Sequence, residues 1–366
     1  MHIDQIVVGA AVGDAVTESA IRIRNALRNT VESNIYAFHR EPNADQDIGL
    51  MEHYPLPSHR SPDDIIVYHV SIGEPGITDF VLHRSERLVL VYHNMTPASF
   101  FRDVDPVFAD LLDAGRRELP TLLDRAEAVI AVSEFNANEL RAMGRHDVVV
   151  AAPPLNLRRL LDIEPDPQIQ AILPVAVPGK MLLFVGQVLP HKRPDLLVAA
   201  HHLLVTNDFP DARLVIAGPS RNKRYANALR RYIDDLALDT VWFTGGLTDG
   251  ELAAMYRRAD VVVTASEHEG FCVPIVEAFN HDVPVIARDF GAVAETARGA
   301  ALVLPSDTGA RHMAEAMRRV LTDDALRDTL VARGRERREH FTVDRTTAGM
   351  LDAIRLIVSG QFGRRR

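Results

Sequence analysis

A regular alternation of short apolar runs with longer amphipathic stretches limits the folds that are open to this chain. The runs are continuous and rich in β-branched residues, which is typical of parallel strands buried on both faces. The stretches between them, such as 17–28 and 136–144, have the spacing of amphipathic helices. Serial β-α units of this kind predict a right-handed, doubly wound α/β sheet. The first set of predicted strands lies at residues 6–9, 34–38, 64–70, 87–93, 128–133 and 147–153.

A proline-rich segment at residues 153–178 interrupts this pattern. It holds six of the chain's 21 prolines, and proline lacks the amide donor that helix interiors and central strands need. We therefore expect a first doubly wound domain at 1–157, a second at 158–345, and a C-terminal helix and tail at 346–366 that pack back toward the first. The second set of predicted strands, followed by a helical tail, lies at 181–186, 212–218, 240–245, 260–266, 283–288 and 300–305.

Composition excludes several classes of protein. The net charge of −9, from 41 basic and 50 acidic residues, argues against a general nucleic-acid binder. The single cysteine, Cys272, rules out an intramolecular disulfide and a zinc site built on several thiolates, which favours a reducing cytoplasm. No apolar run reaches the ~18 residues of a membrane span. Gly9 and Gly13 do not form the G-x-G-x-x-G fingerprint, so a nicotinamide dehydrogenase is not expected.

The segment most informative about chemistry is residues 266–278, SEHEGFCVPIVEA. It directly follows a predicted strand, and Pro274 suits the first turn of a helix because its missing N–H costs nothing there. The backbone N–H groups of 270–273 are then free at a helix N-terminus, where phosphate or sugar oxygens bind. Glu269 precedes the helix and Glu277 lies about one turn inside it. Two carboxylates so placed can accept hydrogen bonds from hydroxyls at two points of a long ligand.

The string E-G-F-C-V-P-I-V-E-A resembles the signature of the retaining glycosyltransferases of family 4, the glycosyl transferases group 1. The resemblance implies a GT-B fold, in which two doubly wound, Rossmann-like α/β domains face each other across a cleft. Residues 1–157 would lie on the acceptor side, and 158–345 would bind the nucleotide sugar. It implies that Glu269 and the backbone of Gly270 and Phe271 hold the donor sugar, while Glu277 holds the ribose hydroxyls. Cys272 and Val273 join the expected nucleotide-sugar-binding residues through the amides at the helix N-terminus.

A second segment, FVGQVLPHKRPDLLVAA at 184–200, resembles the phosphate-binding loop of the same family. Lys192 matches the family's lysine, which would counter the charge of the leaving diphosphate. The family's arginine is replaced by Gln187, which donates a hydrogen bond but carries no charge. Arg193, next to the lysine, is the candidate to compensate for it.

Three further segments are similar to family elements. His93 ends a predicted strand, where family members place a histidine that touches the donor sugar. Gly13 lies in the first loop and would let the backbone approach the ligand closely, although the usual glycine pair is absent. The backbone of 245–248 would lie near the nucleobase. The acidic triplet at Asp103–Asp105 imitates a metal motif, but such triplets arise by chance and we expect no metal site.

Together these features predict an enzyme, a metal-independent hexosyltransferase-type glycosyltransferase that retains anomeric configuration. The expected catalytic residues are His93, Lys192 and Glu269. Its donor substrate would be a nucleotide-diphosphate sugar, and it would need no other cofactor. The acceptor would be a saccharide or glycolipid, as in polysaccharide biosynthesis, with no nucleic-acid partner. The expected location is the cytoplasm or the inner face of its membrane. Basic residues at 333–340 and 364–366 could contact anionic lipid, but we favour a solvated helix face and tail.

Two other functions remain open from the sequence. A nucleotide-sugar epimerase shares this architecture and would use Glu269 and His93 for proton chemistry. A non-catalytic subunit would keep the donor site while assisting a true transferase, and Gln187 and the irregular first loop are compatible with that role. Analysis of the products formed without an acceptor would identify the epimerase. Binding of a nucleotide sugar without turnover would identify the non-catalytic subunit.

Overall fold

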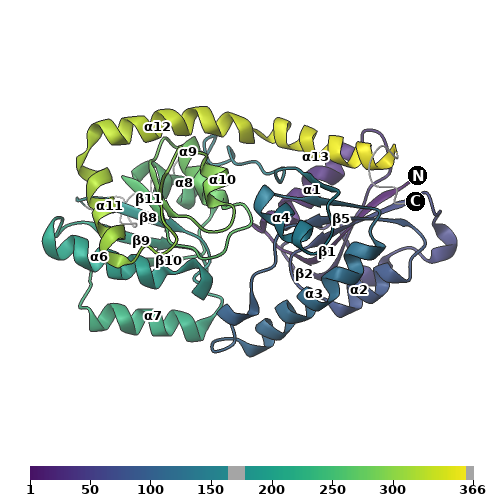
Figure 1. The fold of residues 1–366 in the computed structure, drawn as a ribbon, viewed down its shortest axis with the longest axis horizontal. Helices are drawn as coiled ribbons and strands as arrows, with labels where there is room; N and C mark the ends of the chain where they lie inside the picture. The colour runs from purple at the N-terminus through teal and green to yellow at the C-terminus, as the bar shows by residue number, and fades with distance from the viewer. Residues whose placement is uncertain (164–177, 360–366) are drawn as a thin grey trace. The chain divides into compact units, whose positions relative to one another are not determined.

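The structure, a computed structural model, describes residues 1–163 and 178–359 (Figure 1). The chain divides into two compact units, one of Met1–Leu155 together with the residues from Val343 onward, and one of Asn156–Thr342. These limits lie a few residues from the divisions at 157 and 345 placed by the sequence. The predicted boundary prolines Pro165, Pro167 and Pro174 lie outside the described residues, as do the terminal residues 364–366.

The first unit contains one parallel sheet of seven strands in the order β3-β2-β1-β4-β5-β6-β7. Six of the strands are the predicted ones. The short β3 was not predicted, because three residues at a sheet edge carry too little hydrophobic pattern to stand out from a loop. The strands are β1 (Ile3–Ala10), β2 (Ile35–Arg40), β3 (Ile48–Leu50), β4 (Ile65–Val70), β5 (Arg87–Tyr92), β6 (Ala128–Ala131) and β7 (Val148–Val150).

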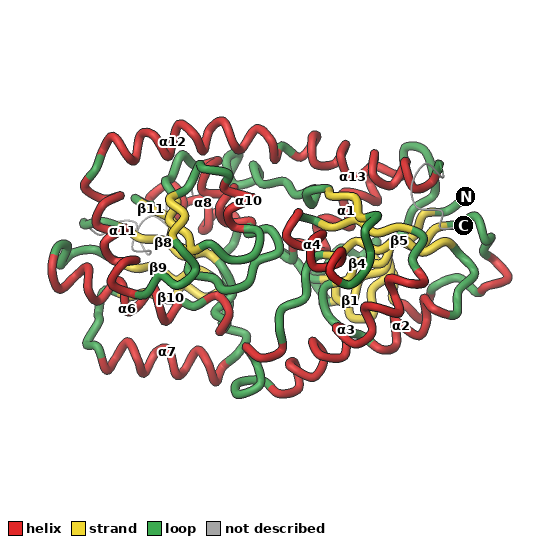
Figure 2. Tube along the Cα trace, in the orientation of Figure 1, coloured by secondary structure: helices red, strands yellow, loops and turns green. Residues whose placement is uncertain are grey.

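Helices cover the sheet of the first unit (Figure 2). Ile3 of β1 and alternate residues of β4, β5 and β6 form one core cluster with the buried faces of α1 and of the C-terminal helix α13. The Arg87 side chain donates hydrogen bonds to the carbonyls of Ile357 and Val358, which ties the end of α13 to the same sheet. The helices are α1 (Ala15–Leu27), α2 (Pro75–Leu82), α3 (Pro106–Arg125), α4 (Glu134–Ala142) and α13 (Val343–Val358).

The second unit contains a parallel sheet of six strands in the order β10-β9-β8-β11-β12-β13. This order reverses between β8 and β11, the arrangement of a doubly wound sheet. All six strands were predicted. They are β8 (Met181–Val185), β9 (Arg213–Ala217), β10 (Val241–Gly245), β11 (Val261–Thr264), β12 (Val285–Arg288) and β13 (Leu302–Leu304).

Side chains that alternate along these strands enter two separate cores. Leu182 and Phe184 of β8 pack with α6, α7 and α11, while Met181 and Leu183 pack with α8, α9 and α10. Burial on both faces of the sheet is the reason that its strands are continuous apolar runs. The helices are α6 (Pro194–Asn207), α7 (Lys223–Asp235), α8 (Asp249–Arg258), α9 (Val273–Asn280), α10 (Val293–Ala297), α11 (Ala310–Thr322) and α12 (Asp324–Arg338). The α/β, doubly wound fold expected from the sequence is therefore confirmed in each unit.

Candidate functional site

The switch point of the second unit lies between β8 and β11, and the loops after these two strands carry the predicted donor-site residues. In an open α/β sheet, ligands bind outside the carboxyl ends of the strands at the position where the strand order reverses. The loop after β8 leads through Lys192 to α6, and the loop after β11 leads through Glu269 to α9. The topology thus brings together two segments that are 77 positions apart in the sequence.

Lys192 and Glu269 form a direct ion pair. The Lys192 Nζ atom lies 2.7 Å from the Glu269 Oε1 atom, and the two side chains are 22% and 9% exposed. Because the pair is largely shielded from water, its two charges attract each other more strongly than those of an exposed pair would. The contact also holds the Lys192 ammonium group in place in the loop after β8.

Further contacts clamp the two loops to each other. The Glu267 N–H donates to the carbonyl of His191 at 2.7 Å. The Arg193 guanidinium pairs with Glu267 and, at 2.9 Å, with Asp195, and these carboxylates raise the pKa of Arg193 further above its usual value. Its charge is therefore balanced within the protein, and in this structure Arg193 fixes the shape of the loop. Whether it also compensates for Gln187 stays a prediction.

Each of the two loops ends in a residue with strained backbone geometry. Arg193 and Cys272 are the N-cap residues of α6 and α9, and both adopt the left-handed region, with φ of 50° and 68°. This conformation is unfavourable for non-glycine residues, and those that adopt it tend to be found at functional sites. Burial raises the pKa of the Cys272 thiol well above its usual value, so the group stays protonated and is no nucleophile.

The N-terminus of α9 presents unpaired backbone donors, as predicted. Within the described residues, the N–H groups of 270–273 donate to no protein acceptor, whereas the next one, of Ile275, bonds the Cys272 carbonyl at 3.2 Å. Such donors, together with the helix dipole, form a binding site for anionic or hydroxyl oxygens. They follow Glu269 directly, so the ion pair and the amides belong to one site.

Gly291, in the loop after β12, packs its backbone directly against the backbone of Glu269. A Cβ atom at this position would lie 2.2 Å from the Glu269 carbonyl oxygen, and its φ of 61° also favours glycine. The adjacent Ala292 N–H donates to the same carbonyl at 2.9 Å. Sequence reasoning missed this support, because only the folded loop shows that two backbones touch there.

Glu277 is buried inside α9 and is held at both carboxylate oxygens. Its Oε1 atom accepts from Arg159 at 2.9 Å, and its Oε2 atom accepts from the Tyr256 hydroxyl at 2.9 Å. Burial raises the pKa of Glu277, and the Arg159 cation opposes that change. The side chain is therefore oriented as an acceptor group, which suits its predicted contact with ribose hydroxyls. Arg159 and Tyr256 carried no motif signal in the sequence.

Two other predicted elements have simpler surroundings. Gln187 is exposed in the loop after β8, and no protein group orients it among the contacts of the described residues. The segment predicted to approach the nucleobase lies at the end of β10, where Thr248 and Glu251 form a capping box that begins α8. The segment 245–248 thus lies between the carboxyl end of β10 and the capped start of α8.

The remaining predicted residues belong to the first unit. Gly13 lies in the exposed loop between β1 and α1 with φ of 76°, a conformation that favours glycine. His93 directly follows β5, and its N–H continues the ladder by donating to the Val70 carbonyl at 2.9 Å. Burial lowers the pKa of His93 to about 4, so the ring is neutral at pH 7.

Asp105 of the acidic triplet and two arginines of the basic segment at 333–340 have structural roles. Asp105 caps α3 by accepting from the Phe108 N–H at 3.1 Å. In residues 1–163 and 178–359, no group of three acidic, histidine or cysteine side chains is arranged to hold a metal ion. Arg335 and Arg338 pair with Asp282. Among the described helices, none is long and apolar enough to cross a membrane.

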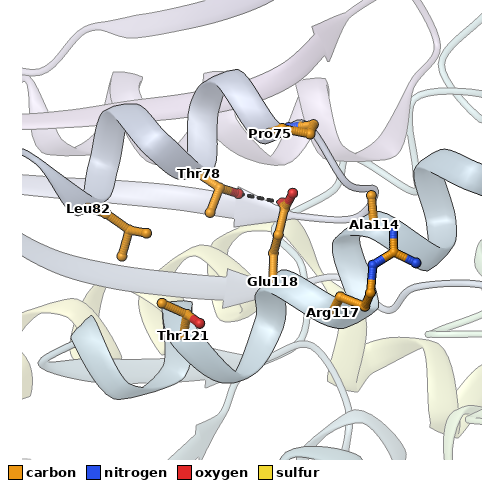
Figure 3. Close-up of a pocket in the computed structure, with 7 residues that line it drawn as sticks. All are labelled: Pro75, Thr78, Leu82, Ala114, Arg117, Glu118 and Thr121. Atoms are coloured by element: carbon orange, nitrogen blue, oxygen red, sulfur yellow. Dashed lines mark hydrogen bonds between the residues drawn. The ribbon is translucent and has the colours of Figure 1, made fainter.

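A surface pocket of about 350 Å³ lies between α2 and α3 of the first unit (Figure 3). Thr78 and Glu118 face each other across it and form a hydrogen bond of 2.6 Å, which satisfies both groups. None of the sequence-predicted site residues lines this pocket, and we assign it no ligand.

Comparison with known proteins identifies relatives of this chain. Residues 166–337 match the family described as Glycosyl transferases group 1. A D-inositol 3-phosphate glycosyltransferase of Kineococcus radiotolerans is 31% identical over 263 residues, which cover 67% of this chain and 60% of that protein. An O-antigen chain mannosyltransferase B of Escherichia coli is 26% identical over 80% of this chain and 74% of its own. The chain belongs to the group 1 glycosyl transferases.

Solved structures show the same fold for this group 1 member. A sucrose-phosphate synthase of Thermosynechococcus elongatus aligns with a TM-score of 0.75 at 20% identity, over 98% of this chain and 99% of that one. Anabaena HepE in complex with UDP and glucose aligns with a TM-score of 0.74 at 17% identity, over 97% and 99% of the two chains. The alignments to the first inositol-phosphate relatives span less than two thirds of their length, 60% and 57%.

Proposed function

We propose that this protein transfers a sugar from a nucleotide-diphosphate sugar to a hydroxyl acceptor, with retention of anomeric configuration and without a metal ion. The observation that carries the proposal is the Lys192–Glu269 ion pair at the switch point, beside the unpaired amides of 270–273. Breaking the bond between the sugar and its phosphate places negative charge on the leaving diphosphate. A lysine and a row of backbone N–H groups are suited to stabilise that charge.

We assign the other residues to binding. Glu277, oriented by Tyr256 and Arg159, would accept hydrogen bonds from the ribose hydroxyls. Glu269 would orient the donor sugar, since a carboxylate paired with lysine is a weaker nucleophile and the sequence places no carboxylate beneath the anomeric carbon. We therefore favour transfer on one face of the sugar, with the leaving phosphate taking the acceptor proton. His93 would contact the donor sugar.

The acceptor and the location are proposed from the relatives. Proteins similar to this chain are named as D-inositol 3-phosphate glycosyltransferase and O-antigen chain mannosyltransferase, so a hydroxyl of a phosphorylated polyol, saccharide or glycolipid is the acceptor we expect. A nucleotide-sugar donor is in keeping with the UDP and UDP-glucose complexes of a protein of the same fold. We propose the cytoplasm, or the inner face of its membrane, as the location of the protein.

A transfer assay in excess EDTA tests the reaction and its metal independence together. Nucleotide sugars are incubated with polyol and saccharide acceptors, and the product anomer is identified by NMR. We expect turnover in EDTA and a product with the anomeric configuration of the donor, because Lys192 and the helix-end amides replace a metal. Strict metal dependence or an inverted product would contradict the proposal. Epimerised donor without acceptor, or binding without turnover, would instead support the two alternative functions.

A further inference from the structure

A buried chain of hydrogen bonds, called the histidine relay below, leads from Gln5 of strand β1 through a second histidine, His69, to His93. The His69 Nδ1 and His93 Nε2 atoms are 2.8 Å apart, and the His69 Nε2 and Gln5 Oε1 atoms are 3.0 Å apart. The two imidazole rings are stacked, with centroids 5.1 Å apart. Gln5 and His69 are completely buried. Polar side chains in such positions are costly unless each hydrogen bond is satisfied, so the direction of every bond in the chain matters.

The orientation of the Gln5 amide sets the direction of the whole chain. Its Nε2 group donates to the carbonyl of Ala20 at 3.0 Å. Reversing the amide would place two acceptor oxygens against each other, so the Gln5 Oε1 atom must be the one that faces His69. That oxygen can only accept, and the His69 Nε2 atom must therefore carry the proton.

The protonation state of His69 determines which nitrogen of His93 carries the proton. Burial lowers the pKa of His69 well below its usual value, with a smaller contribution from His93, so the ring is neutral. A neutral imidazole protonated at Nε2 has a lone pair at Nδ1, which accepts a hydrogen bond. The facing Nε2 atom of His93 must then be the donor. This leaves a lone pair on the Nδ1 atom of His93, for which the described contacts contain no partner.

We propose that Gln5 and His69 are positioning residues that hold His93 in its Nε2-protonated form, so that its Nδ1 atom accepts a hydrogen bond from a hydroxyl of the ligand. A phosphate oxygen, which can only accept, would not be recognised there. The assignment of a sugar hydroxyl rests on the proposed function, whereas the tautomer follows from the geometry of the first unit alone. His93 itself is the residue that contacts the ligand, and the other two act through it.

Nitrogen NMR of protein labelled with 15N-histidine tests this directly, because protonated and unprotonated ring nitrogens have clearly different chemical shifts. The chain has 15 histidines, and the signals of His93 are assigned as those lost in His93→Gln. In the wild-type protein we expect a neutral His93 with a proton on Nε2 and none on Nδ1. A proton on Nδ1 of His93 at pH 7 would overturn the proposal. His93→Gln is used here for assignment alone, and the tautomer itself is read in the wild-type protein.

Three variants then separate positioning from simple packing. His69→Leu removes the acceptor, and we expect mixed tautomers at His93 and a decrease in transfer of about tenfold, the scale on which such outer hydrogen-bond partners act. His69→Asn keeps an oxygen near the Nδ1 position and should restore much of the wild-type spectrum and rate. His201→Leu is the matched control, since His201 is also buried and neutral but bonds Thr240 in the second unit.

The outcomes distinguish this proposal from the function on which it rests. If the wild-type protein transfers no sugar but His93 has the expected tautomer, the relay stands and the proposed reaction fails. If transfer is normal but His69→Leu leaves both the His93 spectrum and the rate unchanged, the relay is wrong and the reaction stands. A loss of folding in His69→Leu, detected by circular dichroism, shifts the test to Gln5→Leu, which should free the tautomer of His69 and thereby that of His93.

Discussion

Replacing Lys192 with alanine is expected to lower the rate of sugar transfer by about two orders of magnitude or more, the effect of removing one group that stabilises charge in a transition state. The lysine is the cation that the structure places beside the free amides of α9, and its partner Glu269 keeps it there. The measurement is kcat/KM for transfer by the purified variant, with circular dichroism to confirm the fold.

Lys180→Ala provides the matched control for this experiment. Lys180 forms a similar ion pair in the same unit, 3.0 Å from Asp260, but it precedes β8 instead of following it. Parallel strands place these two positions at opposite edges of the sheet, so we expect the control to transfer sugar at nearly the wild-type rate. Unchanged turnover in Lys192→Ala would remove the leaving-group role of that lysine.

Replacing Glu269 with alanine is expected to decrease transfer by a similar factor, about two orders of magnitude. The substitution removes the carboxylate that we assign to the donor sugar, and it also frees Lys192 from its partner. The double variant Lys192→Ala, Glu269→Ala separates these effects, because residues in direct contact give non-additive free energies. We expect the double variant to be less impaired than the sum of the single changes in activation free energy.

Glu315→Ala is the control for a lost carboxylate. Glu315 lies on the exposed face of α11, where it pairs with Arg318 at a spacing of three residues. Exposed pairs of this kind contribute little to stability, so both the melting temperature and the rate should be close to those of the wild-type protein. A Glu269→Ala variant as active as this control would show that the carboxylate does not take part in donor binding.

Much of the fold could be predicted from the sequence, because buried parallel strands leave a strong and simple pattern. Short, continuous β-branched runs such as 128–133 are typical of strands covered on both faces, and twelve of the strands observed were expected. The short β3 has no such pattern. The boundary between the units was indicated by prolines, although Pro165, Pro167 and Pro174 lie outside the described residues. The C-terminal helix was expected against the first domain, and α13 packs on the sheet of that unit. Its amphipathic pattern by itself does not specify a sheet, since the apolar face is that of any such helix.

The site could be predicted only where a motif carries it. Lys192, Glu269 and Glu277 stand in recognisable segments, and the structure joins the first two in an ion pair. The groups that support them come from distant positions with no motif of their own. Arg159 and Tyr256 act on Glu277, and Gly291 acts on Glu269 through backbone contact. Contacts between residues so far apart in the chain depend on strand order and loop geometry, which a single sequence does not specify.

The same limit applies to the histidine relay. His93 was a candidate because it ends a strand, but Gln5 and His69 are interior positions of strands β1 and β4. In the sequence His69 is a polar residue within the apolar run at 64–70, whereas Gln5 follows Asp4 and directly precedes the run at 6–9. Only the sheet order β1-β4-β5 brings them beside each other and beside His93. A polar residue in the middle of a buried parallel strand is thus a reason to look for a functional residue at the carboxyl end of the neighbouring strand.

The nucleotide-sugar site is best tested by the melting temperature of the protein with UDP-, GDP-, ADP- and dTDP-sugars, measured for the wild type and for Lys192→Ala. A ligand that binds only the native state raises stability in proportion to the logarithm of its concentration above Kd. We predict that at least one nucleotide sugar raises the wild-type melting temperature in a concentration-dependent way, and that this increase is greatly reduced in Lys192→Ala. Melting temperatures that none of the four sugars changes at millimolar concentration would contradict the assignment of a nucleotide-sugar site to the switch point between β8 and β11.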